Sequence, residues 1–174
     1  MIIDLGCHLS VSSHRTIAKS RLTALEIEIR TRVYWGAFLT DKFQSLYLGR
    51  PPTLRPSEAR VSKVLRDYYE ELENWTPYVD SDATSSTAHL TAYQPRPTYA
   101  ISTFQTLIPL GEIAYSIAST FYSIDSITFP TDHLLRVKFE IQEALDAWRS
   151  DLPLHLQFDP AVDPTPPPNQ ITPQ

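Results

Sequence analysis

Residues 23–52 read TALEIEIRTRVYWGAFLTDKFQSLYLGRPP, and this stretch predicts one long helix with a sharp end. Thr23 can cap the first turn, and Glu26, three residues later, can bond back to it in a capping box. Gly49 suits the left-handed position that closes a helix, and the two prolines after Arg50 cannot extend one. We therefore expect a helix over residues 24–48.

The faces of this helix change along its length. Glu26 precedes Arg30 by four residues, and Glu28 precedes Arg32 by the same spacing, which favours ion pairs on a solvated surface. From Val33 onward, apolar residues point in nearly every direction at about 100° per residue. A helix that is apolar all round is normally buried, so this pattern predicts a buried second half.

Three further helices are expected. An apolar stripe at three- and four-residue spacing predicts a helix over 58–75, begun by Ser57. A second predicted helix covers 98–124, with a kink or break near Pro109, and a third covers 131–151. The fold class is therefore predicted as all-α, an irregular array of about four main helices.

The remaining segments lack periodicity. Residues 76–97 are rich in Ser, Thr, Asp and Pro, and they predict a mobile surface loop. Residues 153–174 are dominated by proline and polar residues, and they predict a disordered linker or tail. This gives one domain over 1–152, followed by the tail.

Composition excludes several function classes. The net charge of −5 argues against direct nucleic-acid binding by this stretch, since phosphate contacts need clustered Lys and Arg. The single cysteine, Cys7, rules out an intrachain disulfide and a multi-thiolate zinc site. Polar residues interrupt the apolar run at 100–124, so no membrane span is expected, and the N-terminal residues do not form a signal-peptide pattern.

No catalytic, cofactor-binding or metal-binding residue is predicted. Four glycines cannot supply a phosphate-cradling loop, and Cys7 beside His8 is a poor catalytic pair because adjacent residues rarely share a catalytic hydrogen bond. His8 and His14 lack further ligands at helical spacing. Glu70, Glu71 and Glu73 are typical of a solvated helix surface. We therefore expect a protein that is not an enzyme and that holds no cofactor.

An Arg pair, a Val, a Trp, an Asp, a Ser and a final Gly-Arg-Pro follow one another within the central helix and its end: Arg30, Arg32, Val33, Trp35, Asp41, Ser45, Gly49, Arg50 and Pro51. This order and spacing resembles the motif of the fungal-specific transcription factor regulatory region. That region is the helical middle segment of the zinc-binuclear-cluster (Zn2Cys6) transcription factors. Weaker similarity extends to residues 4–8 and to Leu145, Trp148, Leu152 and Pro153.

The resemblance implies a regulatory domain that controls RNA polymerase II transcription of metabolic genes in the nucleus. In this family zinc and DNA are bound by a separate six-cysteine cluster, which these residues do not contain. The resemblance also implies that the sequence begins inside one of the family's helices and ends before the later helices of the region. We therefore expect a domain truncated relative to the family, with apolar helix faces that are incompletely covered.

Several alternatives stay open. Arg32, Asp41 and Arg50 could bind an anionic metabolite, or they could be buried charges paired within the domain. Trp35 could belong to the core or form a ligand platform, and a pocket would lie between the central helix and 99–124. The chain could also be a stand-alone helical module that pairs with a full-length factor or a transcriptional co-regulator, or a sensor of a small-molecule inducer.

Overall fold

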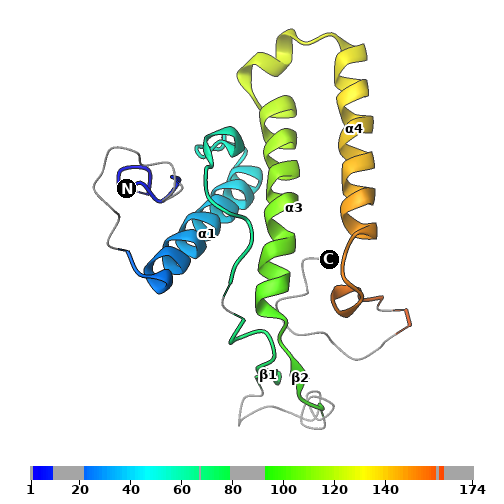
Figure 1. Ribbon diagram of the computed structural model, residues 1–174. Coiled ribbons are helices and arrows are strands. Elements are labelled where there is room, and N and C mark those ends of the chain that lie inside the picture. Colours follow the sequence, from blue (N-terminus) through cyan, green and yellow to red (C-terminus); the bar gives the residue numbers. More distant parts are fainter. Residues whose placement is uncertain (1, 10–21, 67, 79–92, 160, 163–174) are drawn as a thin grey trace. The chain divides into compact units, whose positions relative to one another are not determined.

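A computed structural model describes residues 2–9, 22–66, 68–78, 93–159 and 161–162 (Figure 1). The chain forms two compact units, one of Met1–Asp67 with Gln105–Asp151 and one of Tyr68–Phe104 with Leu152–Gln174. The secondary structure is mostly helical, which agrees with the predicted all-α class. The described residues contain three long helices, not the expected four.

Helix α1 spans Ala24–Leu48 and has the predicted ends. The Thr23 hydroxyl accepts a hydrogen bond from the Glu26 backbone N–H at 3.2 Å, and the Glu26 carboxylate accepts one from the Thr23 N–H at 2.7 Å. Gly49 takes the left-handed conformation at a φ of 62°, and its N–H donates to the carbonyl of Ser45. The predicted capping box and the predicted glycine end are both confirmed. Both could be predicted because they depend on local sequence alone.

Only one face of α1 is buried. The buried side chains recur every three or four residues: Glu28, Thr31, Tyr34, Trp35, Phe38, Leu39, Lys42 and Ser45. On the other side, Val33 is 47% exposed and Tyr47 is 89% exposed. The prediction that the second half is buried all round is therefore wrong, because the described chain covers this helix from one side.

The described residues of 58–75 form no α-helix, so the prediction of a helix there is wrong. A short 3-10 helix, η2 (Pro56–Glu58), is followed by an irregular segment. Ser57 lies inside η2 and not at the start of a longer helix, and Val64 and Leu72 of the predicted stripe are 62% and 70% exposed. Only Leu65, at 1%, is deeply buried.

Tertiary hydrogen bonds explain this difference. The Leu65 N–H donates to the Gln105 side chain at 2.9 Å, and the Arg66 N–H donates to the Glu28 carboxylate at 3.2 Å. The Trp35 indole N–H donates to the Ser62 carbonyl at 2.8 Å. These bonds use backbone groups that a helix would have paired internally, so packing overrides the local pattern.

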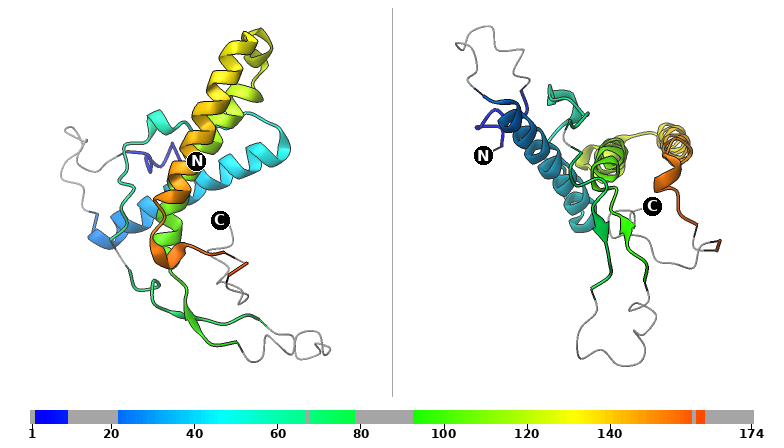
Figure 2. Two further views of the ribbon diagram at one scale, coloured as in Figure 1. Left: turned by 90° about the vertical axis from the view of Figure 1, so that its right-hand side faces the viewer. Right: turned by 60° about the horizontal axis from the view of Figure 1, so that its bottom comes forward.

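Two short strands follow in the second unit. Strand β1 (Asn74–Trp75) pairs antiparallel with β2 (Arg96–Pro97), and Figure 2 shows this strand pair from two further sides. In the register of the pair, Asn74 lies opposite Pro97. The predicted loop 76–97 therefore ends within a strand. Residues 79–92 of that loop lie outside the described residues.

Helices α3 (Ala100–Phe121) and α4 (Thr131–Ser150) match the predictions for 98–124 and 131–151. A kink or a break is predicted near Pro109; helix α3 continues through this residue, so the helix does not break there. The 3-10 helix η4 (Ile124–Thr128) joins the two helices, which run antiparallel (Figure 1). One face of α4 is half-buried (Leu134, Val137, Ile141, Leu145 and Trp148), and its Trp148 indole donates to the Thr106 carbonyl at 2.8 Å.

Residues after α4 are better packed than predicted. The 3-10 helix η5 covers Leu154–Leu156, within the expected linker 153–174. Leu152 is 5% exposed and Leu156 is 0% exposed. The packed chain therefore continues past the predicted boundary at 152, while residues 160 and 163–174 of the predicted tail lie outside the described residues.

The two longest helices approach closely at Gly111. A Cβ atom placed there would lie 2.7 Å from Leu39 Cδ2 and 3.1 Å from Phe38 Cε1, both on α1. The contact below 3 Å requires Leu39 to shift, and both Leu39 and Phe38 are buried, at 6% and 0% exposed. The glycine therefore allows α3 to approach α1 closely at this position.

We expect Gly111→Ala to lower the free energy of unfolding by about 1–2 kcal/mol, because the strain of overpacking exceeds the gain in helix propensity. Gly36→Ala is the matched control, since it also lies inside a helix but has nothing within 4 Å of the added Cβ. That variant should stabilise the chain by about 0.5–1 kcal/mol. Urea unfolding of both variants checks this, and equal effects would contradict the close approach.

Candidate functional site

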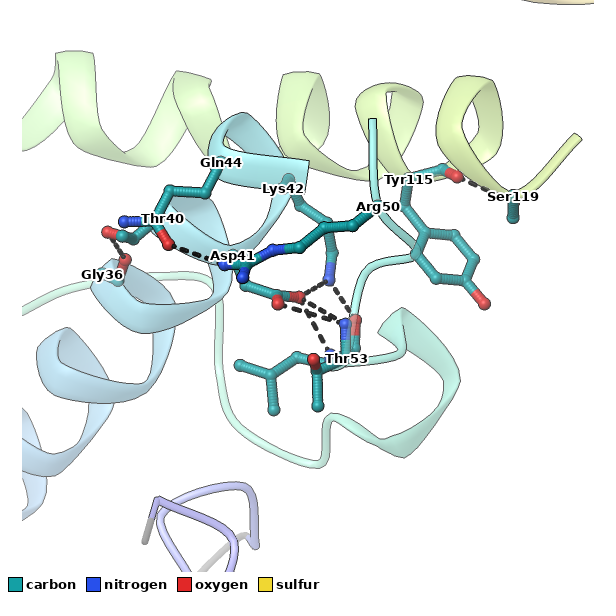
Figure 3. A network of polar contacts seen from close by, with 10 residues as sticks. Gly36, Thr40, Asp41, Lys42, Gln44, Arg50, Thr53, Tyr115 and Ser119 are labelled. Atoms are coloured by element: carbon teal, nitrogen blue, oxygen red, sulfur yellow. Dashed lines mark hydrogen bonds and ion pairs between the residues drawn. The ribbon is translucent and has the colours of Figure 1, made fainter. Parts of the chain in front are cut away.

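A buried lysine lies at the centre of the motif helix. The Lys42 side chain is 0% exposed, and its ammonium donates to Asp41 Oδ2 at 2.6 Å and to the Leu54 carbonyl. Figure 3 shows the ammonium pointing toward the Asp41 carboxylate and the segment that carries Thr53. A buried ammonium is costly unless it is paired and hydrogen-bonded, and here it is both.

Asp41 fastens the chain that follows α1. One of its oxygens, Oδ2, accepts hydrogen bonds from the backbone N–H groups of Thr53 at 3.0 Å and Leu54 at 2.9 Å. Lys42 binds the same segment through the Leu54 carbonyl. We call Asp41, Lys42, Thr53 and Leu54 the helix latch. The latch holds the turn after Gly49 against the last turns of α1.

Two aromatic rings complete the surroundings of the ammonium. The Lys42 Nζ lies 4.4 Å from the centre of the Phe38 ring and 5.3 Å from that of the Tyr115 ring on α3. Aromatic faces attract cations at such distances, most strongly where water is excluded. The latch therefore links the motif helix to the segment after it and to α3.

The two charges have lowered pKa values for different reasons. Burial alone would raise the pKa of Asp41, but hydrogen bonds from Lys42, Leu54 and Thr53, with the charge of Lys42, bring it below the usual 3.8. Burial lowers the pKa of Lys42 below 10.5, although Asp41 partly opposes this. The carboxylate is thus favoured in its charged form, whereas the buried ammonium carries a desolvation cost.

Acid should weaken the latch. Because the pKa of Asp41 is lower in the folded chain than in the unfolded one, its stabilising contribution is present above about 3.8 and is lost as pH falls through the folded value. We expect the difference in unfolding free energy between the natural chain and Asp41→Asn to shrink below pH 4. Urea unfolding from pH 2.5 to 6 measures this difference, and a constant value would refute the expected pH dependence.

Other charged motif residues have separate partners. Arg32 pairs with Glu28 at 3.2 Å, at the spacing predicted from the sequence. Arg30 donates to the Leu5 carbonyl at 2.6 Å, while Glu26, its predicted partner, belongs to the capping box. Arg50 is exposed, and it donates to the Gln44 side chain at 3.3 Å. Arg32, Asp41 and Arg50 thus each bond to a different group of the chain.

The uncharged motif residues are placed as follows. Trp35 is 1% exposed, and its ring makes edge contacts with Tyr34 at 5.1 Å and Phe38 at 5.3 Å. Ser45 is buried, and its hydroxyl oxygen has no hydrogen-bond partner among the described residues. Val33, Gly49 and Pro51 are exposed. Trp35 therefore contributes to the core.

The sequence analysis does not single out Lys42, because a lysine within an apolar helix segment is usually expected to point toward solvent. Its position carried a signal, since Lys42 follows the core residues Phe38 and Leu39 by four and three residues and precedes Ser45 by three. A charge at this spacing lies on the buried stripe. The adjacent Asp41 is the nearest acidic residue in the sequence that could form an ion pair with Lys42.

Within the described ranges, no three His, Cys, Asp or Glu side chains gather in a way that could hold a metal ion. None of the helices described here is both long and apolar enough to cross a membrane.

Comparison with known proteins identifies the family. Residues 1–150 match the sequence profile of the fungal specific transcription factor domain. The nitrogen assimilation transcription factor nirA of Emericella nidulans is 33% identical over 159 residues, which are 90% of this chain and 16% of nirA. The nitrogen assimilation transcription factor nit-4 of Neurospora crassa is 31% identical over 162 residues, or 92% of this chain and 13% of nit-4.

The activatory protein CHA4 of Saccharomyces cerevisiae is 25% identical over 159 residues, which are 89% of this chain and 22% of CHA4. The chain therefore spans less than a quarter of the length of each of these three relatives. No solved structure matches it significantly. On the profile match and these similarities, the chain belongs to the fungal specific transcription factor domain family of transcriptional regulators.

Proposed function

We propose that this chain is the regulatory domain of a nuclear factor that controls RNA polymerase II transcription of metabolic genes. The observation that carries this proposal is the similarity of about nine-tenths of the chain to two transcription factors of nitrogen assimilation. The helix latch supports a structural role for the family motif, since its buried charges are satisfied within the domain. The domain then regulates through contacts with other protein segments, not through chemistry.

We assign DNA recognition and zinc binding to a zinc cluster outside these 174 residues. One cysteine cannot build a six-cysteine cluster, and a net charge of −5 opposes phosphate binding. The proposed domain therefore acts on a DNA-binding part that lies elsewhere in the same polypeptide or in a partner. Purified chain should bind neither zinc nor promoter DNA.

A tagged product expressed from its own locus tests the proposal. We expect nuclear fluorescence, and we expect deletion of the gene to change the transcript levels of nitrogen or carbon utilisation genes when nutrients change. A second strain carrying Asp41→Asn should reproduce part of the deletion phenotype, because the latch holds the domain together. Exclusion from the nucleus together with an unchanged transcriptome would disprove the proposal.

Exposed apolar side chains favour a second candidate, a helical module that pairs with a longer factor or a co-regulator. Phe139 and Leu135 of α4 are 66% and 47% exposed, and Val33 of α1 is 47% exposed. Surfaces of this kind often mark protein–protein contacts. Co-purification of the tagged chain with a second transcription factor would support this candidate, and Phe139→Glu should abolish that co-purification. Recovery of the tagged chain without such a factor would support the first proposal.

A further inference from the structure

The glycines inside the two longest helices differ in what lies next to them. At Gly111 of α3, an added Cβ would meet Leu39 and Phe38 of α1, so close packing within the chain accounts for that glycine. At Gly36, near the middle of α1, an added Cβ would have nothing within 4 Å. A glycine inside a helix costs stability relative to alanine. Contacts among the described residues therefore give no packing reason for Gly36.

Gly36 belongs to an exposed stripe of α1, on the side away from the buried face. The members of the stripe follow one another at three- or four-residue spacing: Leu25, Ile29, Val33, Gly36, Thr40, Phe43 and Tyr47. At about 100° per residue, these positions fall within about 80° of one another. The apolar side chains among them are between 42% and 89% exposed. We call these residues the open stripe, and its spacing is typical of a helix face that packs against another helix.

Thr40 suits an apolar contact in spite of its hydroxyl group. That hydroxyl donates to the Gly36 carbonyl, one turn earlier in α1, at 2.8 Å. Its proton is therefore already bonded within the helix, and the threonine methyl remains for packing. Small residues one turn apart let the backbones of two helices approach closely. Gly36 and Thr40 thus form a shallow place at the centre of the open stripe.

The open stripe is nearly symmetric about Gly36. Ile29 and Phe43 each lie seven residues from it, and Leu25 and Tyr47 each lie eleven residues from it. The members before Gly36 are aliphatic, whereas the members at seven and eleven residues after it are aromatic. In an antiparallel pair of α1 helices that cross at Gly36, Ile29 meets Phe43 of the partner subunit. Leu25 likewise meets Tyr47 of the partner subunit, which is the self-complementarity that a two-fold interface requires.

The charges at the ends of α1 fit the same arrangement. An antiparallel crossing brings the end of one helix next to the start of the other. Arg50, exposed just after the helix, then lies near the exposed Glu26 of the partner subunit. Opposite ends of the two helix dipoles also become neighbours, which favours the antiparallel direction over the parallel one.

We propose that the open stripe is a docking surface for a second copy of this chain, with the two α1 helices packed antiparallel across Gly36. The inference goes beyond the regulatory assignment and does not depend on it. The pairing uses the face of α1 that lies opposite Lys42, so the helix latch stays intact in the dimer. It accounts both for the glycine inside α1 and for the row of exposed apolar side chains on either side of it.

Sedimentation equilibrium of the full chain at several concentrations tests the pairing. We expect the average mass to rise with concentration toward twice the monomer mass. Gly36→Gln places a helix-forming side chain at the crossing point, and it should raise the dissociation constant at least about tenfold while the helical circular dichroism signal is retained. Tyr122→Glu and Tyr47→Glu form a matched pair, since both tyrosines are exposed but only Tyr47 belongs to the open stripe. Only Tyr47→Glu should weaken the dimer.

Disulfide cross-linking tests the direction of the two helices. Cys7→Ala first removes the natural thiol, so that only introduced cysteines can react. Chains carrying Leu25→Cys and chains carrying Tyr47→Cys should form a disulfide when they are mixed, because the two positions meet across the antiparallel pair. Neither variant should form a disulfide by itself at the same concentration.

Three results would overturn the proposal. The first is natural chain that keeps the monomer mass at every concentration, which would leave the open stripe to a different polypeptide. The second is a dimer whose dissociation constant is the same in Gly36→Gln as in the natural chain. The third is a disulfide that forms in Leu25→Cys alone, since this would mean a parallel pair. The stabilisation expected for Gly36→Ala in urea concerns unfolding of the monomer, so these measurements are independent of it.

Discussion

Trp35→Ala is expected to lower the free energy of unfolding by about 3–5 kcal/mol, the usual cost of removing a buried aromatic side chain from a core. Trp35 is 1% exposed, contacts the rings of Tyr34 and Phe38, and donates to the Ser62 carbonyl. The substitution leaves a cavity next to α1 and releases the segment that runs through Ser62. Urea unfolding followed by circular dichroism measures the loss.

Trp35→Phe separates the contribution of ring packing from that of the indole hydrogen bond to Ser62. Phenylalanine keeps most of the packing but loses the 2.8 Å hydrogen bond, and the exposed Ser62 residue lets water replace the donor. We expect a smaller loss of about 1–2 kcal/mol. A loss below 1 kcal/mol for Trp35→Ala would show that the indole is not in the core.

Asp41→Asn is expected to cost about 2–4 kcal/mol at pH 7, because it removes the carboxylate charge and leaves the buried Lys42 ammonium with uncharged partners, namely an amide oxygen, the Leu54 carbonyl and the aromatic rings. This cost has an upper bound, because Lys42 can lose its proton and so avoid being buried as an unpaired charge. Removing the proton from a lysine with the ordinary pKa of 10.5 costs about 5 kcal/mol at pH 7, and the penalty cannot exceed that value. Chemical unfolding at pH 7 provides the measurement.

A double-mutant cycle measures the interaction energy between Asp41 and Lys42. Lys42→Met removes the charge while keeping a long apolar side chain beside Phe38. If the two charges depend on each other, Asp41→Asn should cost much less in the Lys42→Met background than in the natural chain. Additive losses, within about 0.5 kcal/mol, would mean that the two side chains are not coupled.

Local signals explain which elements could be predicted. The capping box at Thr23 and the left-handed Gly49 need only neighbouring residues, and both are confirmed. The bounds of α3 and α4 also follow from local periodicity. By contrast, the stripe at 58–75 has helical spacing, yet Leu65 and Arg66 donate to Gln105 and Glu28, which lie about 40 residues away. No local pattern contains that information.

The same distinction applies to the candidate site. The i,i+4 pair of Glu28 and Arg32 was predictable from spacing, and it forms. The latch was not, because the partners of Asp41 and Lys42 are backbone groups of Thr53 and Leu54, 12 or 13 residues further on. Burial of one face of α1 likewise depends on which segments return to cover it, and Tyr47 shows that the other face stays open.

Amine labelling of the folded chain tests the central claim most directly, namely that the Lys42 ammonium of the helix latch is buried and helps to hold the fold together. A lysine-specific reagent followed by mass spectrometry compares Lys42, whose side chain is fully buried, with Lys63, whose side chain is 48% exposed. We predict rapid labelling of Lys63 and protection of Lys42 until the chain is unfolded in urea. Equal labelling of both lysines in the folded chain would contradict the buried latch.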